Sequence, residues 1–198
     1  MRILLLYNNE CALELVTMLE KIGHIVKTCD FKIDINYFNN NSFDLIISYT
    51  YRYIINKDVI KIFKDKCINI HNSYLPFNKG TNPNLWSILE GTPKGVTIHW
   101  VNEKVDDGDI IAQRLVDFDE KDTLMSSYYK LDTVAKELII QILPYFSYWK
   151  KMSKKSISDG TYHSLSQSKK LLNLINNSYS IMIKDLKLFI KMKLLDYL

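Results

Sequence analysis

Short apolar runs alternate with a helix-like segment at the start of the chain, and this alternation restricts the fold more than any other feature. Residues 2–7, 24–30 and 44–49 each have the character of a strand, and residues 11–22 carry apolar side chains at helical spacing up to Gly23. The run at 44–49 is apolar on both faces, which is typical of a central strand in a parallel sheet. A β-α-β opening of this kind predicts an α/β fold with a right-handed crossover. We therefore expect a Rossmann-like, mostly parallel sheet.

The later elements predict that the sheet is mixed. Helices are expected at 57–64, 84–89 and 126–142, and strands at 67–71, 95–101 and 110–118. Asp122 or Thr123 is a candidate cap for the long helix, and Pro144 marks its end or a kink. The connection 102–109 is too short for a helical crossover, so strand 110–118 is expected to run antiparallel to the strand before it.

Three polar side chains, those of Asn69, His71 and Asp106, are expected at one edge of the sheet. Asn69 and His71 stand two apart in a strand and therefore project to the same face. They precede a loop at the carboxyl end of a buried strand, which is where open α/β sheets place ligands. Asp106 follows His71 by 35 residues, in an acidic turn between two strands. An Asn, a His and an Asp that converge on one crevice predict a group-transfer site.

Composition restricts the class of protein. The 198 residues are 47% hydrophobic and 24% charged, which is typical of a globular domain, and no apolar run is long enough to cross a bilayer. The three cysteines are widely spaced and lack a CxxC pattern, so neither a disulfide framework nor a metal site is indicated. The first apolar run is too short for a signal-peptide core, and we expect a cytoplasmic protein.

Two stretches around these residues resemble the folate-dependent formyltransferases, closest to those that act on nucleotide-linked amino sugars. The first is I-N-I-H-N-S-Y-L-P-F-N-K-G, and the second is G-V-T-I-H-W-V-N-E-K-V-D-D-G-D-I-I. The stretches S-Y-T-Y-R-Y-I and P-N-L-W-S-I-L-E-G-T-P-K-G-V-T-I-H are similar to the nucleotide-sugar branch, as is the Thr-Tyr-His segment at 161–163. The resemblance is specific over residues 44–118.

The resemblance implies an activity and a set of site residues. The expected reaction moves a formyl group from 10-formyltetrahydrofolate to the primary amine of a nucleotide-sugar acceptor, without a metal and without nucleic acid or membrane as a partner. Asn69 and His71 are the implied donors to the oxyanion, and Asp106 rather than Asp107 orients His71 or a water, which leaves Asp107 as a solvated turn residue. His99 is assigned a supporting role. The residues implied to bind the folate are Ile54, Ile55, Asn102, Glu103 and Val105, and those implied to bind the acceptor are Asn9, Asn72 and Lys79.

Other activities remain open. The same residues with water as nucleophile make a formyltetrahydrofolate hydrolase, and a catalytically silent binding module is a further alternative. Glycinamide ribonucleotide is a second candidate acceptor, but the turn after the first strand, residues 7–12, contains no glycine for a phosphate loop. In addition, Asn72 stands where the family commonly has proline, a position at which asparagine can hold the turn through its own side chain.

The end of the chain differs in charge from the rest. Residues 1–149, the expected catalytic domain, carry 16 basic and 19 acidic side chains, whereas residues 150–198 carry 10 Lys and 3 Asp. Residues 150–170 are expected to form a linker or surface arm, and residues 171–198 a helical extension. The helix has a wide apolar face that must be covered, either by the core or by the same helix of a second subunit, which favours a homodimer. That face comprises Ile183, Leu186, Phe189, Ile190, Leu194 and Tyr197.

Overall fold

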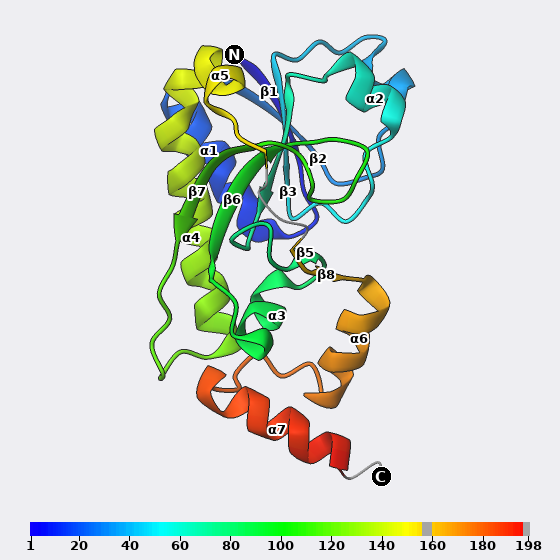
Figure 1. Ribbon diagram of the computed structural model, residues 1–198. Helices are drawn as coiled ribbons and strands as arrows, with labels where there is room; N and C mark the ends of the chain where they lie inside the picture. Colours follow the sequence, from blue (N-terminus) through cyan, green and yellow to red (C-terminus); the bar gives the residue numbers. More distant parts are fainter. Residues whose placement is uncertain (156–159, 196–198) are drawn as a thin grey trace.

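A six-stranded sheet in the order β2-β1-β3-β4-β6-β7 forms the centre of the protein, a computed structural model (Figure 1). The structure describes residues 1–155 and 160–195, without the side chains of residue 187 and residues 193–195. Neighbouring strands among β2, β1, β3 and β4 pair in parallel, whereas β6 pairs antiparallel with both β4 and β7. The mixed, mostly parallel sheet is therefore confirmed. The strands are β1 (Arg2–Leu6), β2 (Ile25–Cys29), β3 (Leu45–Tyr49), β4 (Cys67–His71), β6 (Gly95–Trp100) and β7 (Ile110–Leu115).

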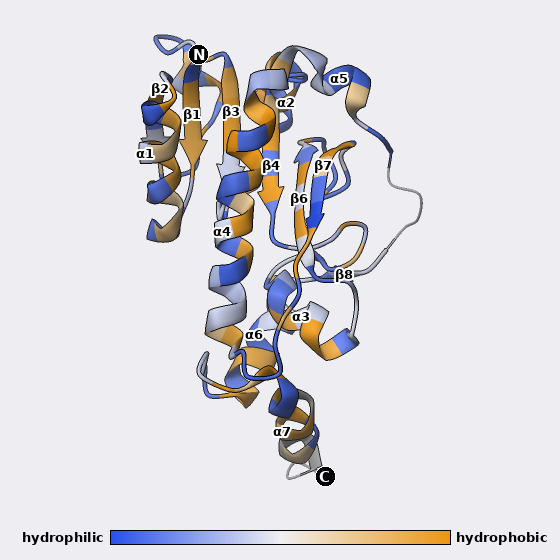
Figure 2. Ribbon diagram, turned by 90° about the vertical axis from the view of Figure 1, so that its left-hand side faces the viewer, coloured by the Kyte–Doolittle hydropathy of each residue, from blue (hydrophilic) through white to orange (hydrophobic). Residues whose placement is uncertain are grey.

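Helices cover both faces of this sheet, which explains why its central strands are apolar throughout. On one face, α1 (Leu13–Lys21) and α4 (Leu124–Ile142) bury Ile3 and Leu5 of β1, and on the other α2 (Lys57–Ile62) lies over Leu4 and Leu6. Alternate residues of one strand thus enter two different cores. Figure 2 shows β1, β3 and β4 as hydrophobic strands between polar outer helix faces.

Local capping residues decide where several elements begin. Thr123 caps α4 and exchanges hydrogen bonds with Ser126, so Thr123 rather than Asp122 is the cap. The helix stops at Ile142, and the 3-10 helix η3 (Leu143–Tyr148) follows, with Pro144 in its first turn. Two other short 3-10 helices are η1 (Glu10–Ala12) and η2 (Ile35–Phe38), and α5 (Trp149–Met152) follows η3.

Residues 150–170 contain more regular structure than the linker that their composition predicts. The short strand β8 (Tyr162–His163) pairs in parallel with β5 (Lys79–Gly80), which lies in the loop after β4. Helix α6 (Leu165–Leu174) begins inside this stretch because Ser164 and Gln167 form a capping box. The Ser-x-x-Gln signal is present in the sequence, but its polar surroundings favoured a linker.

The C-terminal helix α7 (Ile183–Leu195) packs on its own chain. Leu186 and Ile190 are buried in a cluster with Leu85 and Ile88 of α3 (Pro83–Glu90) and with Leu124. Figure 1 shows α3, α6 and α7 grouped below the sheet. The first of the two predicted covers, the core, is thus the one observed; the side chain of Leu194 and all of Tyr197 lie outside the described residues. No helix in the described part of the chain has the length and apolar character to span a bilayer.

Leu186→Ala should lower the free energy of unfolding by roughly 2 to 4 kcal/mol, because it empties a closed apolar site. Leu188→Ala, on the same helix, is the matched control, since Leu186 is 0% exposed and Leu188 is 61% exposed. Urea denaturation of both variants measures the difference. Equal losses for the two would contradict the packing of α7 on its own chain.

Candidate active site

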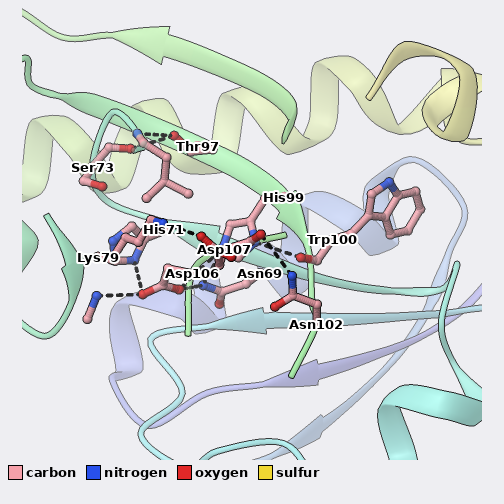
Figure 3. Close-up of polar contacts among 12 residues, drawn as sticks. Asn69, His71, Ser73, Lys79, Thr97, His99, Trp100, Asn102, Asp106 and Asp107 are labelled. Carbon is pink, nitrogen blue, oxygen red and sulfur yellow. Dashed lines mark hydrogen bonds and ion pairs between the residues drawn. The ribbon is translucent and has the colours of Figure 1, made fainter. Parts of the chain in front are cut away.

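The carboxyl end of β4 carries the site, and two neighbouring segments complete it (Figure 3). Asn69 and His71 project from one face of β4, and His99 of β6 stands directly opposite Asn69 in the antiparallel register. Side chains of directly opposed residues lie on the same face, so the register places His99 beside Asn69. The loop after β6 brings Asp106 to this group.

Asp106 is the centre of the cluster. Its Oδ1 accepts a hydrogen bond from Asn69 Nδ2 at 3.0 Å and lies 3.5 Å from His99 Nε2. Its Oδ2 accepts from the backbone N–H of Gly80 at 2.8 Å and lies 3.6 Å from His71 Nδ1. The predicted convergence of Asn69, His71 and Asp106 is therefore present, and the supporting position expected for His99 is too.

Two backbone features hold Asp106 in place. Its φ is +49°, in the left-handed region that Asp tolerates better than most residues. Gly108 follows, where a Cβ would lie 1.6 Å from the Trp100 carbonyl oxygen. Any larger residue at 108 would push the loop away from β6 and carry the carboxylate with it.

The surroundings keep Asp106 ionised. Burial alone would raise its pKa, but the opposing contributions of His71, His99 and the Gly80 N–H hold the pKa of this carboxyl well below its usual range. A carboxylate that accepts several hydrogen bonds and faces imidazole rings is stabilised in its charged form. Asp106 thus supplies a negative charge at the centre of the site.

A pH dependence of stability follows from this shift. Because the pKa is lower in the folded than in the unfolded state, Asp106 contributes its full stabilisation above the unfolded pKa of about 4 and loses it as the pH falls further. The free energy of unfolding of the Asp106→Asn variant should therefore fall less than that of the wild type between about pH 5 and pH 3. This is roughly the range in which an unfolded Asp titrates. Denaturant unfolding at these pH values measures it; parallel curves would contradict the shift.

Asp107 has a partner that the sequence did not indicate. The ammonium group of Lys79 forms an ion pair with its carboxylate and lowers its pKa. Asp107 is therefore a partly exposed turn residue, 32% exposed at its side chain, that also has a charged partner. The chain brings the two together because β5 and the loop after β6 both pass the end of β4. The acceptor-binding role expected for Lys79 is not supported, since its side chain is 9% exposed and its charge is matched within the protein.

His71 is held differently from the expectation of a free ring N–H. Its Nε2 lies 2.9 Å from the carbonyl oxygen of Asn78. A carbonyl only accepts, so Nε2 carries a proton and donates it there. Nδ1 then faces Asp106 Oδ2, 3.6 Å away. The Nε2–H of His71 is therefore already engaged by a backbone carbonyl and is not an unoccupied donor.

The other residues expected at the site fall into two groups. Asn72 is buried, and its Oδ1 has no hydrogen-bond partner among the described residues, which suits a ligand contact. Asn9 uses its side chain to cap η1, where it accepts from the Cys11 N–H at 3.1 Å, and its Nδ2 donates to Tyr128. The Asn9 side chain is therefore already engaged within the protein, whereas the buried Asn72 Oδ1 has no hydrogen-bond partner among the described residues.

The residues expected to bind folate lie in two loops. Ile54 and Val105 are exposed, Ile55 is buried in the core under α2, and Glu103 is exposed. Asn102 holds its own loop, because its side chain donates to the Asp107 carbonyl and accepts from the Lys104 N–H. The main chain and apolar side chains of these loops, rather than the Asn102 amide, are what a pterin ring could contact.

Comparison with known proteins places this arrangement in a family. The sequence profile of the formyl transferase family matches residues 33–143. The chain belongs to the formyl transferase family. A solved structure of the formyltransferase PseJ from Anoxybacillus kamchatkensis, in complex with UDP-4,6-dideoxy-4-formamido-L-AltNAc and tetrahydrofolate, is 39% identical, with a TM-score of 0.85 over 94% of this chain and 97% of that one.

Curated formyl transferase relatives match over shorter stretches. The methionyl-tRNA formyltransferase of Ehrlichia chaffeensis is 37% identical over 60% of this chain and 39% of its own length. The bifunctional polymyxin resistance protein ArnA of Wigglesworthia glossinidia brevipalpis is 36% identical over 56% of this chain and 17% of its own length. The chain thus spans less than half the length of these relatives.

Sequence reasoning missed the backbone groups that hold this formyl transferase site. The Gly80 N–H and the Asn78 carbonyl belong to a loop whose pairing partner lies more than 80 residues away. One signal was available. Gly80 has φ +92°, and a Cβ there would lie 2.2 Å from the His163 carbonyl oxygen, so a lone glycine after the Asn-x-His strand marked a close approach of backbone.

Proposed function

We propose that this protein transfers the formyl group of 10-formyltetrahydrofolate to the primary amine of a nucleotide-linked amino sugar. The main support is the nearly end-to-end likeness to PseJ, whose structure contains a formamido nucleotide sugar together with tetrahydrofolate. Glycinamide ribonucleotide is a weaker candidate. The turn after β1 has no glycine, and the Cys11 N–H that a phosphate would need is already bonded to Asn9.

The cluster around Asp106 suits formyl transfer to an amine. Attack on the formyl carbon places negative charge on the formyl oxygen, and Asn69 can donate one N–H to it while its other N–H stays on Asp106. In the structure Asn69 Nδ2 also lies 3.3 Å from His99 Nε2, so this N–H would turn from the ring nitrogen to the formyl oxygen when the substrate binds. The His71 ring lies beside the same carboxylate, with Nδ1 3.6 Å from Asp106 Oδ2.

Proton transfer is the second task of the site. The amine loses a proton as its bond to carbon forms, and the folate nitrogen gains one as the old bond breaks. Asp106 and His71 together form an acid and base pair of the kind that moves such a proton directly or through a water. The side chains of His71 and Asp106 are only 8% and 10% exposed, so water screens the charge of Asp106 little.

The formyl donor fits the two loops beside this cluster. 10-Formyltetrahydrofolate supplies the activated formyl group, and we assign its binding to the main chain and apolar side chains of Ile54, Ile55 and Val105, with Asn102 and Glu103 shaping the loop. Ile55 and Val101 belong to the same apolar cluster, so the two loops are packed on a common set of apolar side chains. Asn72 is assigned to the acceptor.

A product assay tests the function. Purified protein is incubated with 10-formyltetrahydrofolate and UDP-linked amino sugars, and both formate and formamido sugar are measured by mass spectrometry. A formamido sugar that forms only when protein and amino sugar are both present is the expected result. Formate released without any acceptor would instead indicate a hydrolase, and absence of both products would indicate a binding protein.

Assembly and location extend the proposal. A homodimer is supported by apolar side chains that remain exposed on two elements, Leu188 and Met192 of α7 and Met125 and Tyr129 of α4. Sedimentation velocity measures the mass of the assembly in solution.

A cytoplasmic location is supported by Cys11, Cys29 and Cys67, which are all free thiols. We also keep the division into a catalytic part, 1–149, and a basic arm, 150–198.

A further inference from the structure

The C-terminal arm contacts the loop whose Asn78 carbonyl and Gly80 N–H bond to His71 and Asp106. Residues 160–163 run beside residues 76–81, where Thr161 N donates to the Pro76 carbonyl at 3.2 Å and Lys79 N donates to the Thr161 carbonyl at 2.9 Å. Thr81 N donates to the His163 carbonyl at 3.0 Å. At Gly160, which has φ +67°, a Cβ would lie 1.8 Å from the Pro76 carbonyl oxygen. The contact is close along its whole length.

Asn78 is the residue that this contact holds most tightly. It is fully buried with φ +58°, in the left-handed region. Its N–H donates to Thr161 Oγ1 at 2.8 Å, its Nδ2 donates to Glu90 at 2.9 Å, and its Oδ1 accepts from Thr92 at 2.7 Å. Its main chain and side chain are thus fixed from three sides, and its carbonyl direction is fixed with them.

That carbonyl accepts the Nε2–H of His71 at 2.9 Å, and two residues later the Gly80 N–H donates to Asp106. One short loop therefore sets the ring of His71 through its carbonyl and the carboxylate of Asp106 through its N–H. Without the partner strand β8, this loop would have no backbone partner for Lys79 N or Thr81 N.

The arm is itself anchored around His163. Its ring stacks on Trp86 with centroids 3.7 Å apart and planes at 5°, and its Nε2 lies 3.0 Å from Glu90 Oε1. Glu90 is the same residue that accepts from Asn78 through its other oxygen. The anchor of the arm and the anchor of Asn78 thus share one carboxylate.

We infer that residues 160–163 of the C-terminal arm position the catalytic His71, with Thr161 and Asn78 as positioning residues for formyl transfer. The inference rests on the proposed function insofar as His71 takes part in that reaction. The arm touches no reacting atom in this scheme. It acts by fixing the carbonyl that keeps the proton on Nε2 and turns Nδ1 toward Asp106.

Thr161→Val tests this inference, because it keeps the shape of the side chain and removes the hydroxyl that accepts from the Asn78 N–H at 2.8 Å and donates to Glu90 at 3.5 Å. We expect kcat to fall about tenfold with KM for both substrates nearly unchanged, since a small misplacement of a catalytic group lowers rate more than binding. Tyr162→Phe is the matched control. It also removes one hydroxyl from the arm, but from a side chain that is 57% exposed.

A second readout does not depend on activity. The chain has four histidines, so ring ¹⁵N NMR spectra can be assigned by single substitutions. In the wild type and in Tyr162→Phe, the His71 Nε2 signal should be that of a protonated, hydrogen-bonded nitrogen. In Thr161→Val it should shift, and its proton should exchange faster with water. Asn78→Gly, which keeps the left-handed backbone but removes the bonds to Glu90 and Thr92, should change the signal in the same direction.

The outcomes separate cleanly. A lower kcat together with a changed His71 signal supports the inference. Unchanged kcat, a lower kcat with an unchanged His71 signal, or a raised KM alone would each overturn it, and the last would make the arm a substrate contact. If the wild type forms no formamido sugar at all, the proposed function fails, and the NMR comparison still decides whether the arm positions His71.

Discussion

Asp106→Asn should lower kcat for formyl transfer by about 10³-fold, within the range that general acid and base groups contribute. The substitution keeps the size of the side chain but removes the charge that faces His71 and His99. It also places an NH₂ group opposite donors, because Asn69 Nδ2 and Gly80 N both donate to this carboxylate. The active-site donors would then lose their common acceptor.

Asp107→Asn is the comparison that decides which aspartate acts. Its carboxylate pairs with Lys79 and contacts neither Asn69 nor His71 in the structure. We expect kcat of Asp107→Asn to fall by less than about tenfold. A misplaced loop lowers the rate by such a factor, whereas the loss of an acid or base group lowers it more. Single-turnover rates with saturating substrates measure both variants. Equal losses, or a larger loss for Asp107→Asn, would show that the assignment to Asp106 is wrong.

His71→Ala should also lower kcat by at least about 10²-fold, because it removes the ring that faces Asp106 and can carry a proton. The Asn78 carbonyl and Asp106 would both lose a partner, so the folded state must be checked by circular dichroism and by thermal unfolding. Asn69→Ala is expected to have a loss of similar size through the missing oxyanion donor.

His24→Gln is the matched control for this loss. His24 lies just before β2 and contacts the N-terminal amine, at the end of the sheet away from the Asp106 cluster. Its replacement should leave kcat near the wild-type value. Added imidazole that restores part of the rate to His71→Ala, but not to Asn69→Ala, would support a proton-transfer role. Near-wild-type turnover by His71→Ala on the true acceptor would remove His71 from the mechanism.

The strands of the sheet were predictable because their sequence pattern depends on local geometry. Asn69 and His71 share a face through the two-residue period of a strand, whatever surrounds them. The run at 44–49 is apolar on both faces because helices cover both sides of a parallel sheet, and the structure places α2 and α4 there. The antiparallel pairing of β7 with β6 followed from the length of their connection, whereas the reversal of β6 against β4 is seen only in the structure.

The arm was harder to predict because its strongest contacts use backbone atoms. Strand β8 has only two residues, too few for a period, and its partner β5 has two as well. Charge and serine content favoured a linker, whereas the capping box at Ser164 and Gln167 started a helix. Similarly, Lys79 and Asp107 gave no sign of pairing, since nothing in the sequence says that their two loops meet.

The sequence by itself thus determined the strand that carries Asn69 and His71, the α/β class and the aspartate turn, because each depends on residues close together in the chain. Only the tertiary structure decided how His71 is held. The Asn78 carbonyl, the Gly80 N–H and the Thr161 hydroxyl meet through the pairing of β5 with β8. Every residue has a carbonyl and nearly every residue has an N–H, so a contact between backbone groups across 80 residues leaves almost no trace in side-chain identity.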